Sequence, residues 1–145
     1  MSAPEAILSL VTLGVSDLER SIAFYETLGF RRKAKKADGV GFFQAGAVTF
    51  AVWPACELAK DANAGAAAAP AFRGVALAWN CRSQAEVDSA IARARHAGGS
   101  VPKPAQKTFW GGYAGYFADP DGHLWEIAHN PHWPLAADGR LALPD

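Results

Sequence analysis

The feature that most constrains this chain is an internal repeat, because one order of secondary-structure signals occurs twice. Residues 8 to 15 alternate as a strand does, and Ser16-Asp17-Leu18-Glu19 then has the pattern of a capping box, whose side chains satisfy free amides at the start of a helix. An apolar strand from 74 to 80 is likewise followed by Ser83-Gln84-Ala85-Glu86. The recurrence predicts two copies of one supersecondary unit.

Each copy is expected to contain a helix and three further strands. The first helix should run to Leu28, with Gly29 after it, and the second should run to residue 96 or 97 and stop at Gly98-Gly99. Turn signals place the remaining strands at 30–35, 40–44 and 47–53, and then at 101–107, 113–118 and 123–129. The predicted fold class is α+β: two βαβββ repeats, each a curved mixed sheet with a helix on its outer face, enclosing a ligand cavity.

A length of 145 residues indicates a single domain. We divide it into repeat one at about 7–53, a linker at about 54–72, repeat two at about 73–129 and a C-terminal tail at 130–145. The linker is rich in alanine and proline without an amphipathic period, so we expect a linker or a mobile flap there.

The charge balance excludes two classes of partner. Lysine and arginine number 14, as do aspartate and glutamate, so no excess of positive charge is available for nucleic acid or for an anionic membrane. The first residues, MSAPEAIL, lack the basic region and apolar run of a secretory signal, and no apolar stretch has the length needed to span a bilayer, so we expect neither a signal nor a membrane span. The two cysteines, Cys56 and Cys81, have no partner at metal-ligand spacing, which fits a reducing compartment. We therefore expect a cytoplasmic protein.

Glu126 is the central candidate residue. Aligning Gly41-Phe42-Phe43 with Gly115-Tyr116-Phe117, and Gly46 with Gly122, places Glu126 opposite Phe50. On a strand Glu126 shares a face with residues 124 and 128, whereas residues 125 and 127 point toward a helix. A carboxylate in an apolar hollow either finds a hydrogen-bond partner or raises its pKa. Glu126 is thus a candidate general acid or base, or an anchor for a polar ligand group; the alternative is a carboxylate tied to a neighbouring side chain.

These landmarks resemble the vicinal oxygen chelate superfamily, which includes glyoxalase I, bleomycin-binding resistance proteins and extradiol dioxygenases. The resemblance rests on the segment from Ser16 to Tyr25 with Leu28-Gly29-Phe30, and on Asp119-Pro120-Asp121-Gly122-His123 leading into Glu126. In its metal-dependent members, one ligand comes from the first strand and one from the last strand of each half. Matched onto this chain, those positions are Leu10, Phe50, Val75 and Glu126. Three hydrocarbon side chains cannot ligate a divalent ion, so no metal and no cofactor is expected.

Aromatic side chains are expected to form the wall of the binding site, since rings alternate with glycines from residue 109 to 116. The alternative is ordinary packing of rings in a sheet. The full set of expected ligand-binding residues is Leu10, Phe50, Val75, Trp79, Trp110, Tyr113 and Tyr116.

Two other patterns are interpreted as structural. Glu126-x-x-His129-x-x-His132 resembles a displaced metal site, but on a strand His129 points away from Glu126. The segment from Asp119 to Gly122 is too short for a calcium loop and predicts a tight turn.

Three functions remain open. The first is a metal-independent protein that binds a small, partly apolar organic molecule, as bleomycin-binding relatives do. The second is a glyoxalase-type lyase or isomerase in which Glu126 transfers a proton. The third and weakest is a metal-dependent dioxygenase. The resemblance also implies a homodimer, because the halves of this family often pair across two chains.

Overall fold

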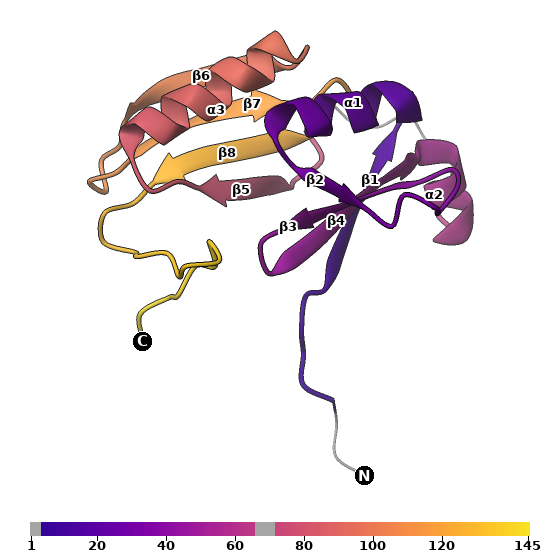
Figure 1. Cartoon of the computed structure of the whole chain (residues 1–145), viewed down its shortest axis with the longest axis horizontal. Helices are drawn as coiled ribbons and strands as arrows, with labels where there is room; N and C mark the ends of the chain where they lie inside the picture. Colours follow the sequence, from indigo (N-terminus) through magenta and orange to yellow (C-terminus); the bar gives the residue numbers. More distant parts are fainter. Residues whose placement is uncertain (1–3, 66–71) are drawn as a thin grey trace.

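Two four-stranded sheets, one from each half of the chain, form the frame of the protein (Figure 1). The computed structural model describes residues 4–65 and 72–145. The first half and the segment after it contain β1 (Leu10–Val15), α1 (Leu18–Leu28), β2 (Arg31–Lys33), β3 (Gly41–Ala45), β4 (Val48–Pro54) and α2 (Ala55–Asp61). The second half contains β5 (Ala76–Asn80), α3 (Gln84–His96), β6 (Ser100–Lys107), β7 (Tyr113–Ala118) and β8 (Leu124–His129).

Both sheets have the same topology, which confirms the predicted α+β fold of two βαβββ repeats. The strand orders are β1-β4-β3-β2 and β5-β8-β7-β6. In each sheet the first and last strands of the half pair in parallel, and the other neighbours are antiparallel. Within the described part of the chain, no helix has the length and apolar character needed to cross a bilayer.

The two helix starts differ in detail. Ser83 caps α3 by accepting a hydrogen bond from the Glu86 amide, while the Glu86 carboxylate accepts one from the Arg82 amide, close to the predicted capping box. The cap of α1, however, is Asp17, one residue after the predicted Ser16. The Ser16 amide and hydroxyl instead donate to Asp121 of the second half, so a residue expected to cap a helix joins the two halves.

The segment that we expected to be a linker or mobile flap begins with a short helix, α2, which was not predicted from the sequence. A Cβ atom added at Gly14 of β1 would lie 3.2 Å from Ala55 and 3.4 Å from Leu58, which shows how closely α2 packs on this strand. Residues 66–71 of the expected linker lie outside the described residues.

The same close approach of helix to sheet occurs in both halves. A Cβ atom added at Gly41 of β3 would lie 2.8 Å from Ile22 of α1, and one added at Gly115 of β7 would lie 2.8 Å from Ile91 of α3. Only glycine leaves room for these helices. The alignment of Gly41 with Gly115 in the two repeats is therefore confirmed.

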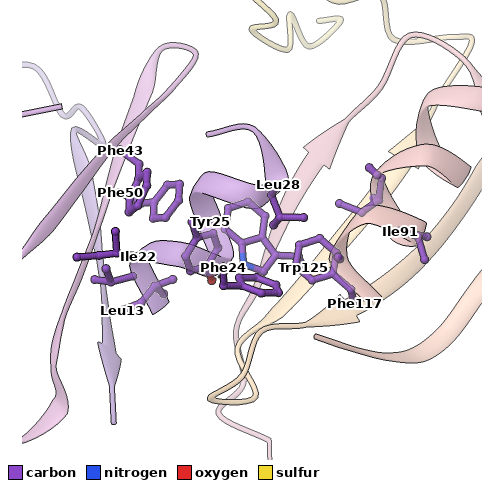
Figure 2. Close-up of a cluster of buried hydrophobic side chains, with 14 of the residues drawn as sticks. Leu13, Ile22, Phe24, Tyr25, Leu28, Phe43, Phe50, Ile91, Phe117 and Trp125 are labelled. Atoms are coloured by element: carbon purple, nitrogen blue, oxygen red, sulfur yellow. Dashed lines mark hydrogen bonds between the residues drawn. The ribbon is translucent and has the colours of Figure 1, made fainter. Parts of the chain in front are cut away.

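The helix-covered faces of both sheets meet in one shared core (Figure 2). The ring of Tyr25 on α1 lies 4.9 Å from that of Phe50 on β4 and 5.9 Å from that of Trp125 on β8, measured between centroids. Aromatic side chains fill the space between the halves, so the expected enclosed cavity is not formed there within the described residues. The opposite face of each sheet, which we call its open face, points away from this core.

The turn between β7 and β8 is the tight turn that the sequence predicts. The Gly122 amide donates to the Asp119 carbonyl at 2.9 Å, and Gly122 has a φ of 85°, a left-handed conformation that favours glycine. The Asp119 carboxylate organises the turn by accepting hydrogen bonds from the amides of Asp121 and His123. His123 also bonds through its ring to the Gly14 carbonyl oxygen of β1, which ties the turn to the first half.

Candidate functional site

Glu126 lies on the open face of the second sheet. Its neighbours along β8, Trp125 and Ile127, are buried against the helices, as predicted from strand alternation. Directly across from Glu126 in the sheet are Ala78 on β5 and Tyr116 on β7. The carboxylate therefore stands in a row of side chains that crosses the sheet.

Tyr116 and Glu126 form the polar centre of this face. The Tyr116 hydroxyl donates a hydrogen bond of 3.0 Å to Oε2 of Glu126. Desolvation, followed by this hydrogen bond and the charge of Glu126, raises the pKa of Tyr116, so the phenol stays protonated and remains a donor. Asn80 is the one further polar position of β5, β7 and β8 on the same face, and the others carry small or aliphatic side chains: Ala76, Ala78, Ala114, Ala118, Leu124 and Ala128.

Lys103 belongs to the same row but was not predicted as a site residue. It pairs with Tyr116 across β6 and β7, so its side chain starts on the open face beside the phenol. Neither of the ion pairs found among the described residues includes Lys103. The pairing of β6 with β7 shifts in register on both sides of Lys103. Strict alternation of residues along β6 therefore does not predict which face the Lys103 side chain occupies.

Phe50 does not share a face with Glu126, so that part of the predicted site geometry is wrong. Phe50 pairs with Phe43, Trp125 pairs with Phe117, and both pairs lie on the helix-covered side. Phe50 is only 3% exposed. The second hairpin holds one residue more than the first between these partners, 118–124 against 44–49, so the structural counterpart of Glu126 is Ala51.

Trp79 and Tyr113 also lie on the helix-covered side. Trp79 pairs with Ile127, and its ring centroid is 5.4 Å from that of Phe30. The Tyr113 hydroxyl donates a 2.7 Å hydrogen bond to Asp88 on α3. The structure therefore does not bring these two aromatic residues to the face that carries Glu126.

The remaining predicted residues are dispersed. Leu10 is 43% exposed and lies on the open face of the first sheet, paired with Thr49. Val75 immediately precedes β5 and is 61% exposed. Trp110 lies in the turn between β6 and β7, with its ring over Gly112, where an added Cβ atom would be 1.9 Å from the ring. Of the predicted ligand-binding set, the structure brings only Tyr116 into contact with Glu126.

Two hollows lie beside the β7–β8 turn, where residues of both halves line them. The smaller, of about 30 Å³, includes Val75 in its lining, and the larger, of about 380 Å³, is lined by Gly14, Ser16, Ala55, Arg73, Asp121 and His123. Arg73 contacts His123 and the Asp121 carbonyl, so these polar groups largely satisfy one another. Neither hollow includes Glu126, which is half-buried on the open face of the second sheet.

The donors present do not fit the divalent metal site that the resemblance implies. The counterparts of Glu126 in the corrected register, Thr12, Ala51 and Ala78, supply neither imidazole nor carboxylate. His129 contacts the Cys81 carbonyl oxygen and pairs with Tyr113, on the face opposite to Glu126. Within residues 4–65 and 72–145, no group of three histidine, cysteine, aspartate or glutamate side chains is placed to hold a metal ion. One carboxylate cannot compete with water for such an ion.

Comparisons of the sequence and of the structure with known proteins lead to the same superfamily. A family model described as Glyoxalase/Bleomycin resistance protein/Dioxygenase superfamily matches residues 7–127. A glyoxalase-related enzyme from Fulvimarina pelagi is 37% identical, with a TM-score of 0.85 over 96% of this chain and 99% of that one. A glyoxalase/bleomycin resistance protein/dioxygenase from Nocardioides is 28% identical, with a TM-score of 0.71 and coverage of 88% and 85%.

A more distant similarity concerns the fold alone. A lactoylglutathione lyase from Agrobacterium tumefaciens is 23% identical, with a TM-score of 0.67 over 92% of this chain and 100% of that one. None of the curated proteins compared with the chain gives a significant sequence match.

Proposed function

Because the chain belongs to the glyoxalase/bleomycin resistance protein/dioxygenase superfamily, we propose that it binds a small, partly apolar organic molecule on the open face of its second sheet, without the divalent metal. The observation that carries this proposal is the 3.0 Å hydrogen bond from Tyr116 to Glu126, on a face where the other positions of β5, β7 and β8 are small or aliphatic apart from Asn80. Tyr116 holds the carboxylate in place, and Glu126 presents an oriented acceptor to a ligand. The exposed methyl groups of Ala76 and Ala78 beside Glu126 offer apolar surface that a ligand would bury.

A second copy of the chain completes this site in our proposal. Within one chain both open faces point away from the shared core, so neither is covered by the other half. The first half also exposes three large apolar side chains in and just before β1, namely Ile7, Leu8 and Leu10. Packing the open face of one first half over the partner's second half would bury both this surface and the ligand.

Ligand binding is tested with isotope-labelled protein and a panel of small aromatic compounds, followed by amide chemical shifts. We expect shifts concentrated in β7 and β8, and a loss of binding in Glu126→Gln. Glu26→Gln, an exposed carboxylate on α1, is the matched control and should bind as the natural chain does. Binding that survives unchanged in Glu126→Gln, or no binding by any compound, would refute the proposed site.

The dimer is tested by light scattering on protein eluting from a sizing column. We expect a mass of two chains for the natural protein and of one chain for Leu10→Glu, with loss of ligand binding in that variant. Leu143→Glu adds the same charge at another exposed apolar position and should remain dimeric. A natural chain that is monomeric and still binds ligand would contradict the second-copy proposal.

The Tyr116–Glu126 contact also favours one alternative, a glyoxalase-type lyase or isomerase. In this alternative Glu126 removes a proton next to a carbonyl, and the Tyr116 hydroxyl turns from the carboxylate to donate its one hydrogen bond to the oxygen that becomes negative, in place of a metal. Turnover of the methylglyoxal–glutathione adduct that resists chelators and vanishes in Glu126→Gln would support this function. Absence of turnover in the natural chain would leave the binding function and remove this alternative.

Metal analysis tests the remaining alternative, a metal-dependent dioxygenase. A stoichiometric transition metal in the purified protein would contradict the metal-independent proposal, because the donor set described above does not provide a site for one. We further propose a reducing, cytoplasmic location, which the unpaired state of Cys56 and Cys81 supports.

A further inference from the structure

A row of four residues crosses the open face of the second sheet in register, and each offers different chemistry. From β6 to β5 the row consists of Lys103, Tyr116, Glu126 and Ala78. It contains a cation, a hydrogen-bond donor, an anion and a methyl group. The equivalent row in the first sheet is Lys33, Phe42, Ala51 and Thr12, in which the phenol and the carboxylate are replaced by hydrocarbon.

Tyr116 and Glu126, in the centre of the row, are hydrogen-bonded to each other, whereas Lys103 forms no ion pair with the described residues. Tyr116 donates to Oε2 of Glu126, and no other hydrogen bond to that carboxylate is formed by the described residues, so Oε1 remains available to accept one. Lys103 has no ion pair among the described residues and extends from the neighbouring strand. A ligand lying across Tyr116 would therefore meet a positive charge on one side and an acceptor on the other.

The width of the sheet limits the size of such a ligand. Neighbouring strands lie about 4.8 Å apart, so the backbones at Lys103 and Glu126 are separated by about 10 Å. The flexible lysine stem and the glutamate side chain shorten this gap to the length of a small substituted ring. Ala114 and Ala128 in the adjacent rows are buried, so the apolar surface open to such a ring is the half-buried Tyr116 ring and the exposed methyl group of Ala78.

We infer that the ligand is a small aromatic or unsaturated acid, whose anionic oxygen group binds Lys103 and whose opposite end carries a hydroxyl or amino group that donates to Glu126. This inference rests on the proposed function and adds the substrate class to it. An anion at Lys103 forms a charge-assisted hydrogen bond, and a donor at Glu126 uses the free oxygen. A molecule that lacks the anionic group leaves Lys103 without a partner, and one that lacks the donor leaves the free oxygen of Glu126 without a hydrogen bond.

The probes that test the inference are 4-hydroxybenzoate, its methyl ester and 4-methoxybenzoate, titrated calorimetrically into the full chain. The ester removes the anion and the methoxy compound removes the donor. We expect 4-hydroxybenzoate to bind at least about tenfold more tightly than either analogue. Its affinity should also fall with rising salt, since Lys103 is exposed, while that of the ester should not.

Two lysine variants on one strand separate this site from general charge effects. Lys103→Met should weaken 4-hydroxybenzoate by about tenfold and leave the ester unchanged. Lys107→Met is the matched control, because Lys107 pairs with Tyr113 and starts on the opposite, helix-covered side of the sheet. Its affinity for all three probes should equal that of the natural chain.

The outcomes distinguish this inference from the proposed function beneath it. If the acid binds no better than the ester, while binding of both still depends on Glu126, the function stands and the inference is overturned. If 4-hydroxybenzoate binds equally to the natural chain and to Glu126→Gln, the proposed site itself fails. If none of the three probes binds while neutral compounds shift β7 and β8, the acid class is likewise overturned.

Discussion

The Tyr25 hydroxyl donates a hydrogen bond of 2.6 Å to Oδ2 of Asp119, across a separation of 94 residues in sequence. Both residues are buried, and the same hydroxyl accepts a hydrogen bond from the indole N–H of Trp125. Helix α1 of the first half is thereby tied to the turn and last strand of the second. This contact makes the two repeats one packed unit around a common aromatic core.

Replacing Tyr25 with phenylalanine should destabilise the chain by about 1–3 kcal/mol, because Oδ2 of Asp119 loses its donor in a buried place. Urea unfolding of the two proteins measures the difference. Tyr113→Phe is the control, since Tyr113 also donates to an aspartate, but at an exposed position, and should cost less than about 1 kcal/mol. Equal losses in the two variants would contradict the bridging role of Tyr25.

Stability should fall at alkaline pH. Burial, and then the charge of Asp119, raises the pKa of Tyr25 well above its ordinary value, and burial raises the pKa of the Cys81 thiol to about 11. Both groups are neutral when folded, and the unfolded chain gives up their protons first, so their contribution is complete below pH 9 and is lost as the pH rises above it. Urea midpoints at pH 8, 9.5 and 11 should decrease in that order.

The substitution Cys81→Ala provides the control for this pH dependence. It removes one of the two groups, so the fall between pH 9 and 11 should become shallower, while the natural chain keeps the steeper profile. Superimposable pH profiles for the two proteins would show that the Cys81 thiol has no part in the alkaline loss.

The close approach of each helix to its sheet predicts a cost for adding one methyl group. Gly115→Ala should destabilise by about 1–3 kcal/mol, because its Cβ atom would lie 2.7 Å from the backbone nitrogen of Ala105 as well as against Ile91. Gly41→Ala should cost less, since its nearest contacts are side-chain atoms of Ile22 and Val52. Gly65→Ala, where an added Cβ atom would meet no atom of the described residues within 4 Å, should be neutral or slightly stabilising.

Most of the fold could be predicted because its signals are local. Alternation, capping residues and turn glycines placed the strands and the two long helices to within about two residues of their observed bounds. The helix α2 was missed because it has no buried residues and hence no amphipathic pattern. Its sequence, ACELAKD, consists largely of strong helix formers, so intrinsic propensity was the available signal.

The site was predicted less well because it depends on register. The second hairpin holds one residue more than the first, so the alignment of the two repeats by their turn glycines was wrong by one position beyond the turn. Because side chains on a strand alternate between two faces, this error of one position assigned Phe50 to the face of Glu126, whereas Phe50 lies in the core. Lys103 was missed for a related reason, since the register shifts around it interrupt the alternation of β6. Tyr116 was found as one of the rings that alternate with glycines from residue 109 to 116, but the same pattern also selected Trp110 and Tyr113, which lie elsewhere.

The two aspartates of the β7–β8 turn should respond differently to loss of charge. Both oxygens of Asp119 accept hydrogen bonds, from Tyr25 at one and from the amides of Asp121 and His123 at the other. In Asp119→Asn an amide N–H must face one of these donors, so we expect a loss of about 1–3 kcal/mol.

Asp121→Asn should be nearly neutral by comparison. Its Oδ1 accepts from Ser16 and can continue to do so as the amide oxygen, whereas its Oδ2 is buried and has no hydrogen-bond partner among the residues that the structure describes. The substitution replaces a buried anionic oxygen near Asp119 with a neutral amide nitrogen, which costs less to bury, and this offsets the weaker acceptor that remains for Ser16. Thermal unfolding of both variants at pH 7 provides the comparison. A loss for Asp121→Asn as large as that for Asp119→Asn would show that Oδ2 of Asp121 has a partner in solution, for which Arg20, 3.9 Å from Oδ1, is the nearest cation.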